Sequence, residues 1–235
     1  MPNDYFSFKQ FTIQQDRCAF KVGTDGVLLG AYADITGAGR ILDIGSGTGL
    51  IAIMLAQRSN ADIFALEPDA ESYSQLTDNI EACLWKERIH GVNCSVQDYD
   101  PGYKFGLIVS NPPYFINSVR NPDGRKSGAR HNDNLPHEEL LKSVTGLLEE
   151  NGRFQVIMPF AEGNVLIAEA AAYGLYCNEI LKIKPLPSSE IRRLIMTFRR
   201  QKEKASEKFL TIEHGPRHEF TEDYRALTKD FYLRF

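Results

Sequence analysis

The sequence is poor in the residues that build disulfide frameworks and zinc sites. Its cysteines number only four in 235 residues, and none of them forms a CxxC pair. They stand at Cys18, Cys83, Cys94 and Cys177. This scatter argues against a disulfide-stabilised fold and against a metal site. We therefore expect a reduced, cytoplasmic protein that binds no metal.

Long hydrophobic runs are also missing. No apolar stretch approaches the roughly 20 residues that a membrane-spanning helix needs. The amino terminus lacks the charged segment and apolar run of a secretory signal. With 43% hydrophobic and 25% charged residues, the composition is that of an ordinary water-soluble protein, and the length suits one large domain. We expect no membrane partner.

An excess of positive charge is absent too, since the formal net charge is −4. Cations nevertheless gather in two places, and such local clusters can attract phosphates. Residues 182–208 hold nine cations against three glutamates, namely Lys182, Lys184, Arg192, Arg193, Arg199, Arg200, Lys202, Lys204 and Lys208 against Glu190, Glu203 and Glu207. The second cluster lies earlier in the chain, at residues 120–130. A solvated strand face is the alternative interpretation of the first cluster.

Strand and helix patterns alternate along the chain. Apolar, β-branched runs predict strands at residues 40–45, 62–68, 89–96, 104–110 and 153–159. Helical patterns separate or follow them at residues 48–58, 70–85, 136–148 and 160–173. This alternation predicts an α/β, doubly wound, mostly parallel sheet. Residues 179–185 and 191–200 predict an antiparallel hairpin at its edge, Asn151-Gly152 predicts a helix stop, and Thr221 predicts the cap of a terminal helix.

The first strand leads into a glycine-rich loop, DIGSGTG, at residues 43–49. Glycines there permit a tight turn and let a ligand approach the backbone. The dinucleotide fingerprint GxGxxG fails, because its third glycine falls on Leu50, and no phosphate-binding lysine follows. Asp43 before the glycines suits a cationic or amine-bearing ligand instead.

Acidic residues follow the next two strands. Glu67 ends the second strand, where this architecture places a carboxylate that binds ribose hydroxyls. Asp98 follows the third strand and can accept a hydrogen bond from an adenine amine. Together with the glycine loop they predict a nucleoside-bearing ligand at the carboxyl edge of the sheet. Turn glycines and surface acids are the alternative.

A stiff segment, Asn-Pro-Pro-Tyr-Phe, follows the strand at residues 104–110. Proline cannot continue a central strand, and the residue before it is held extended. The strand therefore ends in an amide, a free carbonyl and an aromatic ring, at Asn111, Pro112 and Tyr114. An ordinary Asn-Pro turn is the alternative.

The order DIGSGTG, ALEPD, NPPY resembles class I S-adenosylmethionine-dependent methyltransferases over nearly the whole chain. The resemblance implies a Rossmann-like fold with a seven-stranded sheet and an antiparallel carboxyl-terminal hairpin. It implies one domain over residues 1–235: a capping segment (1–38), a catalytic core (39–202) and a strand and helix extension (203–235). It also implies S-adenosylmethionine as the cofactor, bound by Asp43, Gly45, Ser46, Gly47, Gly49, Glu67, Pro68, Asp98 and Asn111.

NPPY implies methylation of a planar, conjugated nitrogen. The Asn111 side-chain oxygen and the Pro112 carbonyl would accept hydrogen bonds from the amine, held rigid by the two prolines. Tyr114 and Phe115 would stack on the base. Asn111, Pro112, Pro113 and Tyr114 are thus the expected catalytic residues.

KVGTDGVLLG, NPPYF and ARHN, in this order, are similar to the bacterial enzymes that methylate the adenine beside the anticodon of a valine tRNA. This resemblance implies transfer to adenine N6 in a tRNA anticodon loop. Separately, we expect the protein to be a monomer. It gives Thr24 and Asp25 a cofactor-binding role; the alternative is that they cap the following helix. The substrate phosphates would meet the basic loop, at Arg120, Arg125, Lys126 and Arg130.

Other functions remain open at this point. The acceptor could be a release-factor glutamine, an rRNA adenine or a small molecule, or the chain could be a non-catalytic RNA-binding module. Only about forty residues precede the strand of the glycine loop, too few for the extra helical domain of glutamine methyltransferases. Binding RNA alone would not require Asp43, Glu67, Asp98, Asn111 and Tyr114 together.

Overall fold

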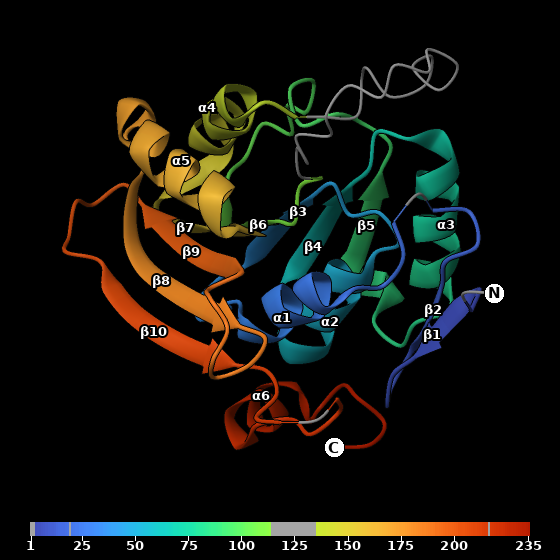
Figure 1. The fold of residues 1–235 in the computed structure, drawn as a ribbon. Coiled ribbons are helices and arrows are strands. Elements are labelled where there is room, and N and C mark those ends of the chain that lie inside the picture. Colours follow the sequence, from blue (N-terminus) through green and yellow to red (C-terminus); the bar gives the residue numbers. More distant parts are fainter. Residues whose placement is uncertain (1–2, 19, 114–134, 216) are drawn as a thin grey trace, which may run out of the picture.

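A central sheet organises the chain in this computed structural model, which describes residues 3–18, 20–113, 135–215 and 217–235 (Figure 1). Within these residues the sheet has eight strands, in the order β10-β8-β9-β7-β6-β3-β4-β5. Their bounds are β3 Arg40–Ile44, β4 Asp62–Leu66, β5 Ile89–Val92, β6 Phe105–Ser110, β7 Leu148–Pro159, β8 Tyr176–Lys184, β9 Arg193–Arg199 and β10 Ser206–Thr211. All neighbours pair in parallel except β9, which is antiparallel to both β7 and β8.

The α/β fold class and the antiparallel hairpin β8–β9 are therefore confirmed. The strand count differs by one, and the hairpin does not form the edge of the sheet. β10, from the carboxyl-terminal extension, pairs with β8 and brings the sheet to eight strands in the described residues. Only Leu210 of β10 is buried. Its other residues are exposed or half-buried, and its sequence lacks the apolar run that marks the other strands of the sheet.

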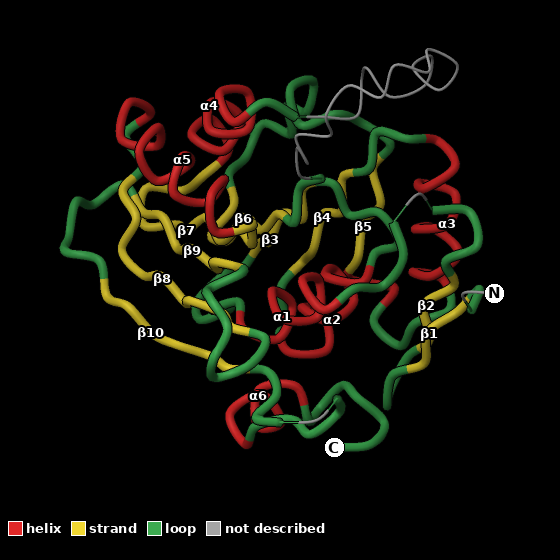
Figure 2. Tube along the Cα trace, in the orientation of Figure 1, coloured by secondary structure: helices red, strands yellow, loops and turns green. Residues whose placement is uncertain are grey.

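Helices cover both faces of the sheet (Figure 2). Helices α1 (Thr24–Tyr32), α2 (Leu50–Arg58), α3 (Ala70–Glu81) and α6 (Glu222–Thr228) contribute to one hydrophobic cluster. Helices α4 (His137–Leu147) and α5 (Phe160–Ala170) belong to another, on the opposite face. No helix in the described part of the chain is long and apolar enough to cross a membrane.

Some element boundaries differ from the sequence predictions. Helix α3 ends at Glu81 and a 3-10 turn, η1 (Lys86–Arg88), leads into a shortened β5. The helix stop predicted at Asn151-Gly152 is wrong, because α4 ends at Leu147 and β7 already begins at Leu148. A Cβ at Gly152 would lie 2.9 Å from Leu148 Cδ1 and 3.0 Å from the Phe105 carbonyl. This glycine therefore permits the close packing of β7 on β6.

The helix predicted at residues 160–173 and the cap predicted at Thr221 are both confirmed. Helix α5 continues into the 3-10 turn η2 (Ala171–Tyr173), and Gly174 ends it with a φ of 70°. Thr221 caps α6, since its hydroxyl accepts a hydrogen bond from the Tyr224 N–H at 3.2 Å.

A small amino-terminal hairpin, β1 (Tyr5–Ser7) and β2 (Thr12–Gln14), lies beside α3. The Asn79 side chain of α3 accepts from the Gln14 N–H and donates to the Gln14 carbonyl, both at 2.9 Å. The chain then passes the middle of α3, where Gln75 accepts from the Arg17 N–H at 3.0 Å. This path leads the segment before α1 along the carboxyl edge of the sheet.

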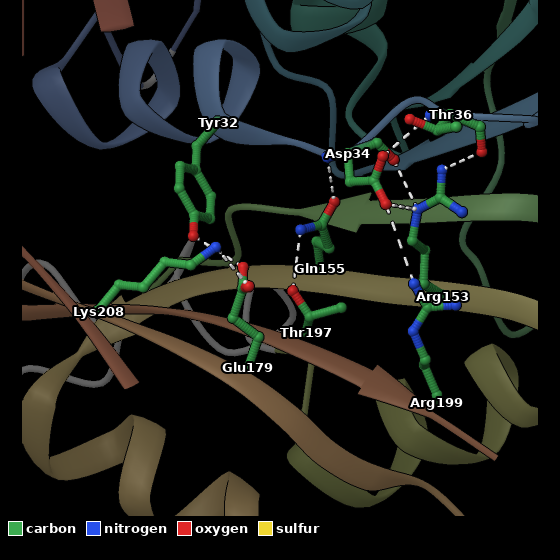
Figure 3. A network of polar contacts seen from close by, with 9 residues as sticks. All are labelled: Tyr32, Asp34, Thr36, Arg153, Gln155, Glu179, Thr197, Arg199 and Lys208. Carbon is green, nitrogen blue, oxygen red and sulfur yellow. Dashed lines mark hydrogen bonds and ion pairs between the residues drawn. The ribbon is translucent and has the colours of Figure 1, made fainter. Parts of the chain in front are cut away.

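A polar network fixes the exit of α1 to the antiparallel part of the sheet (Figure 3). The Gln155 side chain accepts from the Asp34 N–H at 2.7 Å and donates to the Thr197 hydroxyl at 2.9 Å. The Arg153 guanidinium donates to the carbonyls of Asp34 and Thr36 at 2.6 and 2.5 Å. These carbonyls lie beyond the end of α1 and accept no hydrogen bond from the helix. The guanidinium therefore satisfies them.

A second set of contacts ties β10 to α1 (Figure 3). The Tyr32 hydroxyl donates to one Glu179 oxygen at 2.7 Å, and Lys208 donates to the other at 2.7 Å. Burial raises the pKa of Tyr32, and the hydrogen bond to the Glu179 carboxylate raises it further. The phenol is thus a permanent donor at ordinary pH, and it links helix, β8 and β10.

Replacing the buried Arg153 should destabilise this junction. Arg153→Met removes the donors of two carbonyls and the ion pair of Nε with Asp34 Oδ2 at 3.1 Å. We expect the free energy of unfolding to fall by about 2–4 kcal/mol in urea titrations. The exposed Lys204→Met should change it by less than about 0.5 kcal/mol. Equal effects of the two substitutions would contradict the structural role of Arg153.

Candidate functional site

The glycine loop connects β3 to α2 at the carboxyl edge of the sheet. The N–H groups of Gly45 and Ser46 donate to the Leu66 carbonyl at 3.0 and 2.8 Å, which fastens the loop to β4. Gly45 and Gly47 have φ values of 72° and 54°, and a Cβ at either position would meet nothing within 4 Å. Described residues leave the space beside these glycines open, so a ligand can approach the backbone there.

Gly49 has a different constraint. Its φ is 83°, and a Cβ there would lie 2.6 Å from Leu76 Cδ1 of α3. The third loop glycine therefore allows α2 to begin against α3. A glycine is needed at this position so that the two helices can pack closely. At Gly45 and Gly47 the glycines instead leave the backbone open to a ligand.

Asp43 is fully buried at the end of β3. Neither carboxylate oxygen has a hydrogen-bond partner among the described residues. Burial raises the pKa of Asp43 to about 7. The Ser46 side chain and the Ala52 N–H lie near the carboxylate, without the geometry of a hydrogen bond, and offset part of this rise, whereas the charge of Glu67 adds to it. A buried acid without a partner is costly unless a cationic ligand pairs with it.

Glu67 follows β4 and is almost completely buried. Its Oε2 accepts from the Gly47 N–H at 2.8 Å, and its Oε1 accepts from the Asp69 N–H at 3.0 Å. The carboxylate therefore also orders the glycine loop, a role that sequence reasoning did not foresee.

Residues after β5 complete this edge of the sheet. The Asn93 amide donates to the carbonyls of Glu67 and Pro68 at 2.8 and 3.1 Å, so it holds the backbone beside the loop. Asp98 is exposed, and its Oδ2 accepts from the Ser95 hydroxyl at 2.6 Å. Sequence reasoning missed Asn93, whose only signal is its position directly after β5.

Asn111 follows β6 and lies beside the start of α1. Ser110 before it donates to the Ile44 carbonyl at 2.9 Å, which aligns the end of β6 with that of β3. A Cβ at Gly26 would come within 3.9 Å of Asn111 Nδ2 and 3.1 Å of Leu50 Cδ2. Helix α1 thus meets the end of β6 and the start of α2. Tyr114, Phe115, Arg120, Arg125, Lys126 and Arg130 lie outside the described residues.

The turn at Thr24 and Asp25 is held by an ion pair, and its side chains do not cap helix α1. Gly23 is the N-cap of α1, and no side chain among the described residues caps the helix, so the capping alternative is wrong. Arg193 at the start of β9 donates from Nε to Asp25 Oδ2 at 2.7 Å. Arg193 was expected only as a member of a phosphate-attracting cluster, because a contact across 168 residues leaves no local sequence signal.

The two prolines line a small hollow beside α4 and α5. Its other lining residues are Leu135, His137, Leu140, Met158 and Glu162. In the described ranges, no group of three or more His, Cys, Asp or Glu side chains could hold a metal ion. The site therefore combines acidic strand ends, open glycine backbone and a rigid Asn-Pro-Pro segment.

Comparisons with known proteins agree with this arrangement. Residues 22–163 match the family described as "Methyltransferase small domain". A protein of Bacteroides thetaiotaomicron named tRNA1(Val) (adenine(37)-N6)-methyltransferase is 45% identical over 99% of both chains. One of the same name from Flavobacterium psychrophilum is 44% identical over 97% of this chain and 99% of its own.

Solved structures share the fold at low sequence identity. A predicted O-methyltransferase from Agrobacterium tumefaciens has a TM-score of 0.65 at 20% identity, covering 88% of this chain and 96% of its own. A glycopeptide N-methyltransferase complexed with S-adenosyl-L-methionine has a TM-score of 0.55 at 14% identity, covering 77% and 100%. Both likenesses concern the fold alone.

The buried Asp43 should make the ligand-free protein less stable as pH rises. The folded-state pKa of about 7 exceeds the usual 3.8, so the folded state holds its proton longer than the unfolded state. Stability is therefore lost between about pH 4 and 7 and stays low above that range. At pH 8, Asp43→Asn should unfold at a higher urea concentration than wild type, with a free energy of unfolding about 2–4 kcal/mol greater. The difference should shrink toward pH 4, and parallel pH profiles would contradict this assignment.

Proposed function

Since the chain belongs to the "Methyltransferase small domain" family, we propose that it methylates the N6 amine of an adenine beside a tRNA anticodon. The methyl donor would be S-adenosylmethionine. The observation that carries the proposal is the full-length similarity to enzymes of this name, at 45% and 44% identity. The rigid Asn111-Pro112-Pro113 segment beside the glycine loop supports it independently.

The residues of the glycine loop fit S-adenosylmethionine. This cofactor carries an ammonium group, ribose hydroxyls, an adenine and a methyl group activated by a sulfonium. Asp43, buried and without a partner among described residues, would pair with positive charge. The open backbone at Gly45 and Gly47 would admit the methionine part beside Ser46.

Two acids and the α1 turn would hold the rest of the cofactor. Glu67 and Pro68 stand where the ribose is expected, and Asp98 would accept from the adenine amine. Thr24 and Asp25 would close over the bound cofactor at the start of α1. The ion pair of Asp25 with Arg193 at 2.7 Å orients this turn toward β9.

Asn111 and Pro112 would activate the acceptor amine. Its lone pair is delocalised into the adenine ring, which makes the nitrogen a poor nucleophile. The Asn111 side-chain oxygen and the Pro112 carbonyl would accept hydrogen bonds from the two N–H groups of the amine. These bonds would orient the nitrogen toward the activated methyl. Pro113 keeps the carbonyl fixed, so little reorganisation is needed at the transition state.

The remaining expected residues would bind the RNA around the target base. Tyr114 and Phe115 would stack on the adenine, a contact that contributes roughly 1–3 kcal/mol per base. Arg120, Arg125, Lys126 and Arg130 would meet phosphates. An anticodon loop suits this arrangement, because its unpaired bases can leave the stack at modest cost. The protein would act as a monomer in the cytoplasm, where tRNA is modified.

Isotope transfer tests the proposal. The purified protein is incubated with methyl-labelled S-adenosylmethionine and tRNA from a strain lacking the activity, and the RNA is digested to nucleosides for mass spectrometry. We expect labelled N6-methyladenosine in one tRNA species. Label in rRNA or in a release factor, with none in tRNA, would refute the tRNA assignment and retain the methyltransferase.

Asn111→Ala should separate catalysis from cofactor binding. Loss of the acceptor amide should lower kcat at least about 100-fold, as removal of one preorganised hydrogen-bonding group does elsewhere. The dissociation constant for S-adenosylmethionine, measured by calorimetry, should change less than about threefold. Joint loss of both properties would contradict a purely catalytic role of Asn111 and would assign it to cofactor binding or to the fold.

A further inference from the structure

One face of β8 and β10 carries an aromatic ring beside two lysines. Lys182 and Lys184 are two residues apart on β8, so their side chains share a face. Phe209 of β10 is the register partner of Lys182, and the Lys182 ammonium lies 5.7 Å from the centre of its ring. Phe209 is 61% exposed, although it is a large apolar residue in the middle of a strand.

The opposite face of the same strands accounts for core packing. Leu181, Ile183 and Leu210 are buried there, in the cluster that includes α1 and α6. Lys208 points to that side as well, since its ammonium meets Glu179 and the Tyr32 ring. The exposed Phe209 therefore has no part in the core, and it lies on the edge strand of the sheet (Figure 1).

The cations of residues 182–208 separate into two groups by strand direction. β8 and β9 are antiparallel, so the end of β8 and the start of β9 meet at the carboxyl edge. Lys184 and Arg192 lie there, and the Arg192 N–H donates to the Ile183 carbonyl at 2.8 Å. Arg199, Arg200, Lys202 and Lys204 lie at the other end, roughly 20 Å away along β9.

Several of these cations already have acidic partners. Lys182 pairs with Glu207 at 2.6 Å, Lys208 with Glu179 at 2.7 Å and Arg193 with Asp25 at 2.7 Å. Lys184 and the exposed Arg192 pair with no acid among the described residues. These two are the cations of the carboxyl edge that can meet an external anion without breaking an ion pair.

This surface is continuous with the candidate active site. Asn111 follows β6 at the same edge, and four strand spacings separate β6 from β10 in the sheet order. At about 4.8 Å each, these spacings place β10 roughly 19 Å from β6. A polynucleotide whose target base enters at Asn111 can span this distance in a few nucleotides.

We propose that Lys184, Arg192 and Phe209, here called the β8–β10 face, bind the RNA strand that flanks the target adenine. Lys184 and Arg192 contact its phosphates, and a flanking base stacks on Phe209. The proposal rests on the RNA methyltransferase function proposed above. Three acids lie near this face: Glu190, Glu207 and Glu213. Lys182 neutralises Glu207, and the Glu213 N–H donates to the Pro185 carbonyl at 2.9 Å.

Binding measurements on the full chain test the proposal. Unmodified valine tRNA transcript is titrated by fluorescence anisotropy at several salt concentrations, and S-adenosylmethionine affinity is measured in parallel. Phe209→Ala should weaken tRNA binding about 5- to 150-fold. Lys184→Gln with Arg192→Gln should lower the slope of log affinity against log salt by about 1.4, for two phosphate contacts. Cofactor affinity should stay within about twofold.

Matched controls come from the same molecule. Leu84→Ala removes another exposed apolar side chain, 75% exposed, beyond α3. Lys202→Gln with Lys204→Gln removes two cations from the opposite end of the sheet. Both controls should bind tRNA as wild type does.

The outcomes separate this proposal from the function on which it rests. If the wild type methylates tRNA and the β8–β10 variants bind tRNA as tightly as the wild type, the proposed face is wrong and the proposed function stands. A loss confined to the Lys202 and Lys204 variant would place RNA at the opposite end of the sheet. A wild-type protein that neither binds nor methylates tRNA overturns both proposals.

Discussion

The buried Asp43 carboxylate is the constraint on which the candidate site depends. It ends β3 with neither oxygen bonded by a described residue, and burial raises its pKa to about 7. Around it the loop is firmly held, because the Leu66 carbonyl and the Glu67 carboxylate accept from Gly45, Ser46 and Gly47. A rigid loop with one uncompensated acid is organised for a ligand that brings positive charge.

The rest of the architecture brings distant segments to this loop. Helix α1 packs on α2 at two glycines: a Cβ at Gly26 would be 3.1 Å from Leu50, and one at Gly30 would be 2.8 Å from Met54. Its start is held by Arg193 of β9, and its exit is held by Arg153 of β7. The antiparallel strands thus position the helix whose first turn adjoins Asn111. Substrate and cofactor would meet where these contacts converge.

Sequence reasoning identified the features that depend on local pattern. Apolar runs located the parallel strands, and strand ends placed Asp43, Glu67 and Asn111 at one edge. It did not include β10 in the sheet, because that strand buries only Leu210. It took Gly152 as a helix stop, although close contact with β6 is what requires a glycine there. The ion pair of Arg193 with Asp25 and the backbone contacts of Asn93 were not predicted, because these partners are distant in sequence.

Proton release on cofactor binding tests the central claim most directly. The S-adenosylmethionine titration is followed by calorimetry at pH 6 in buffers of different ionisation enthalpy. Asp43, with its pKa of about 7, is mostly protonated there and should ionise when it pairs with the cofactor. We expect release of nearly one proton per cofactor bound in wild type and almost none in Asp43→Asn. Binding without proton release in wild type would contradict the pairing of Asp43 with a cationic ligand.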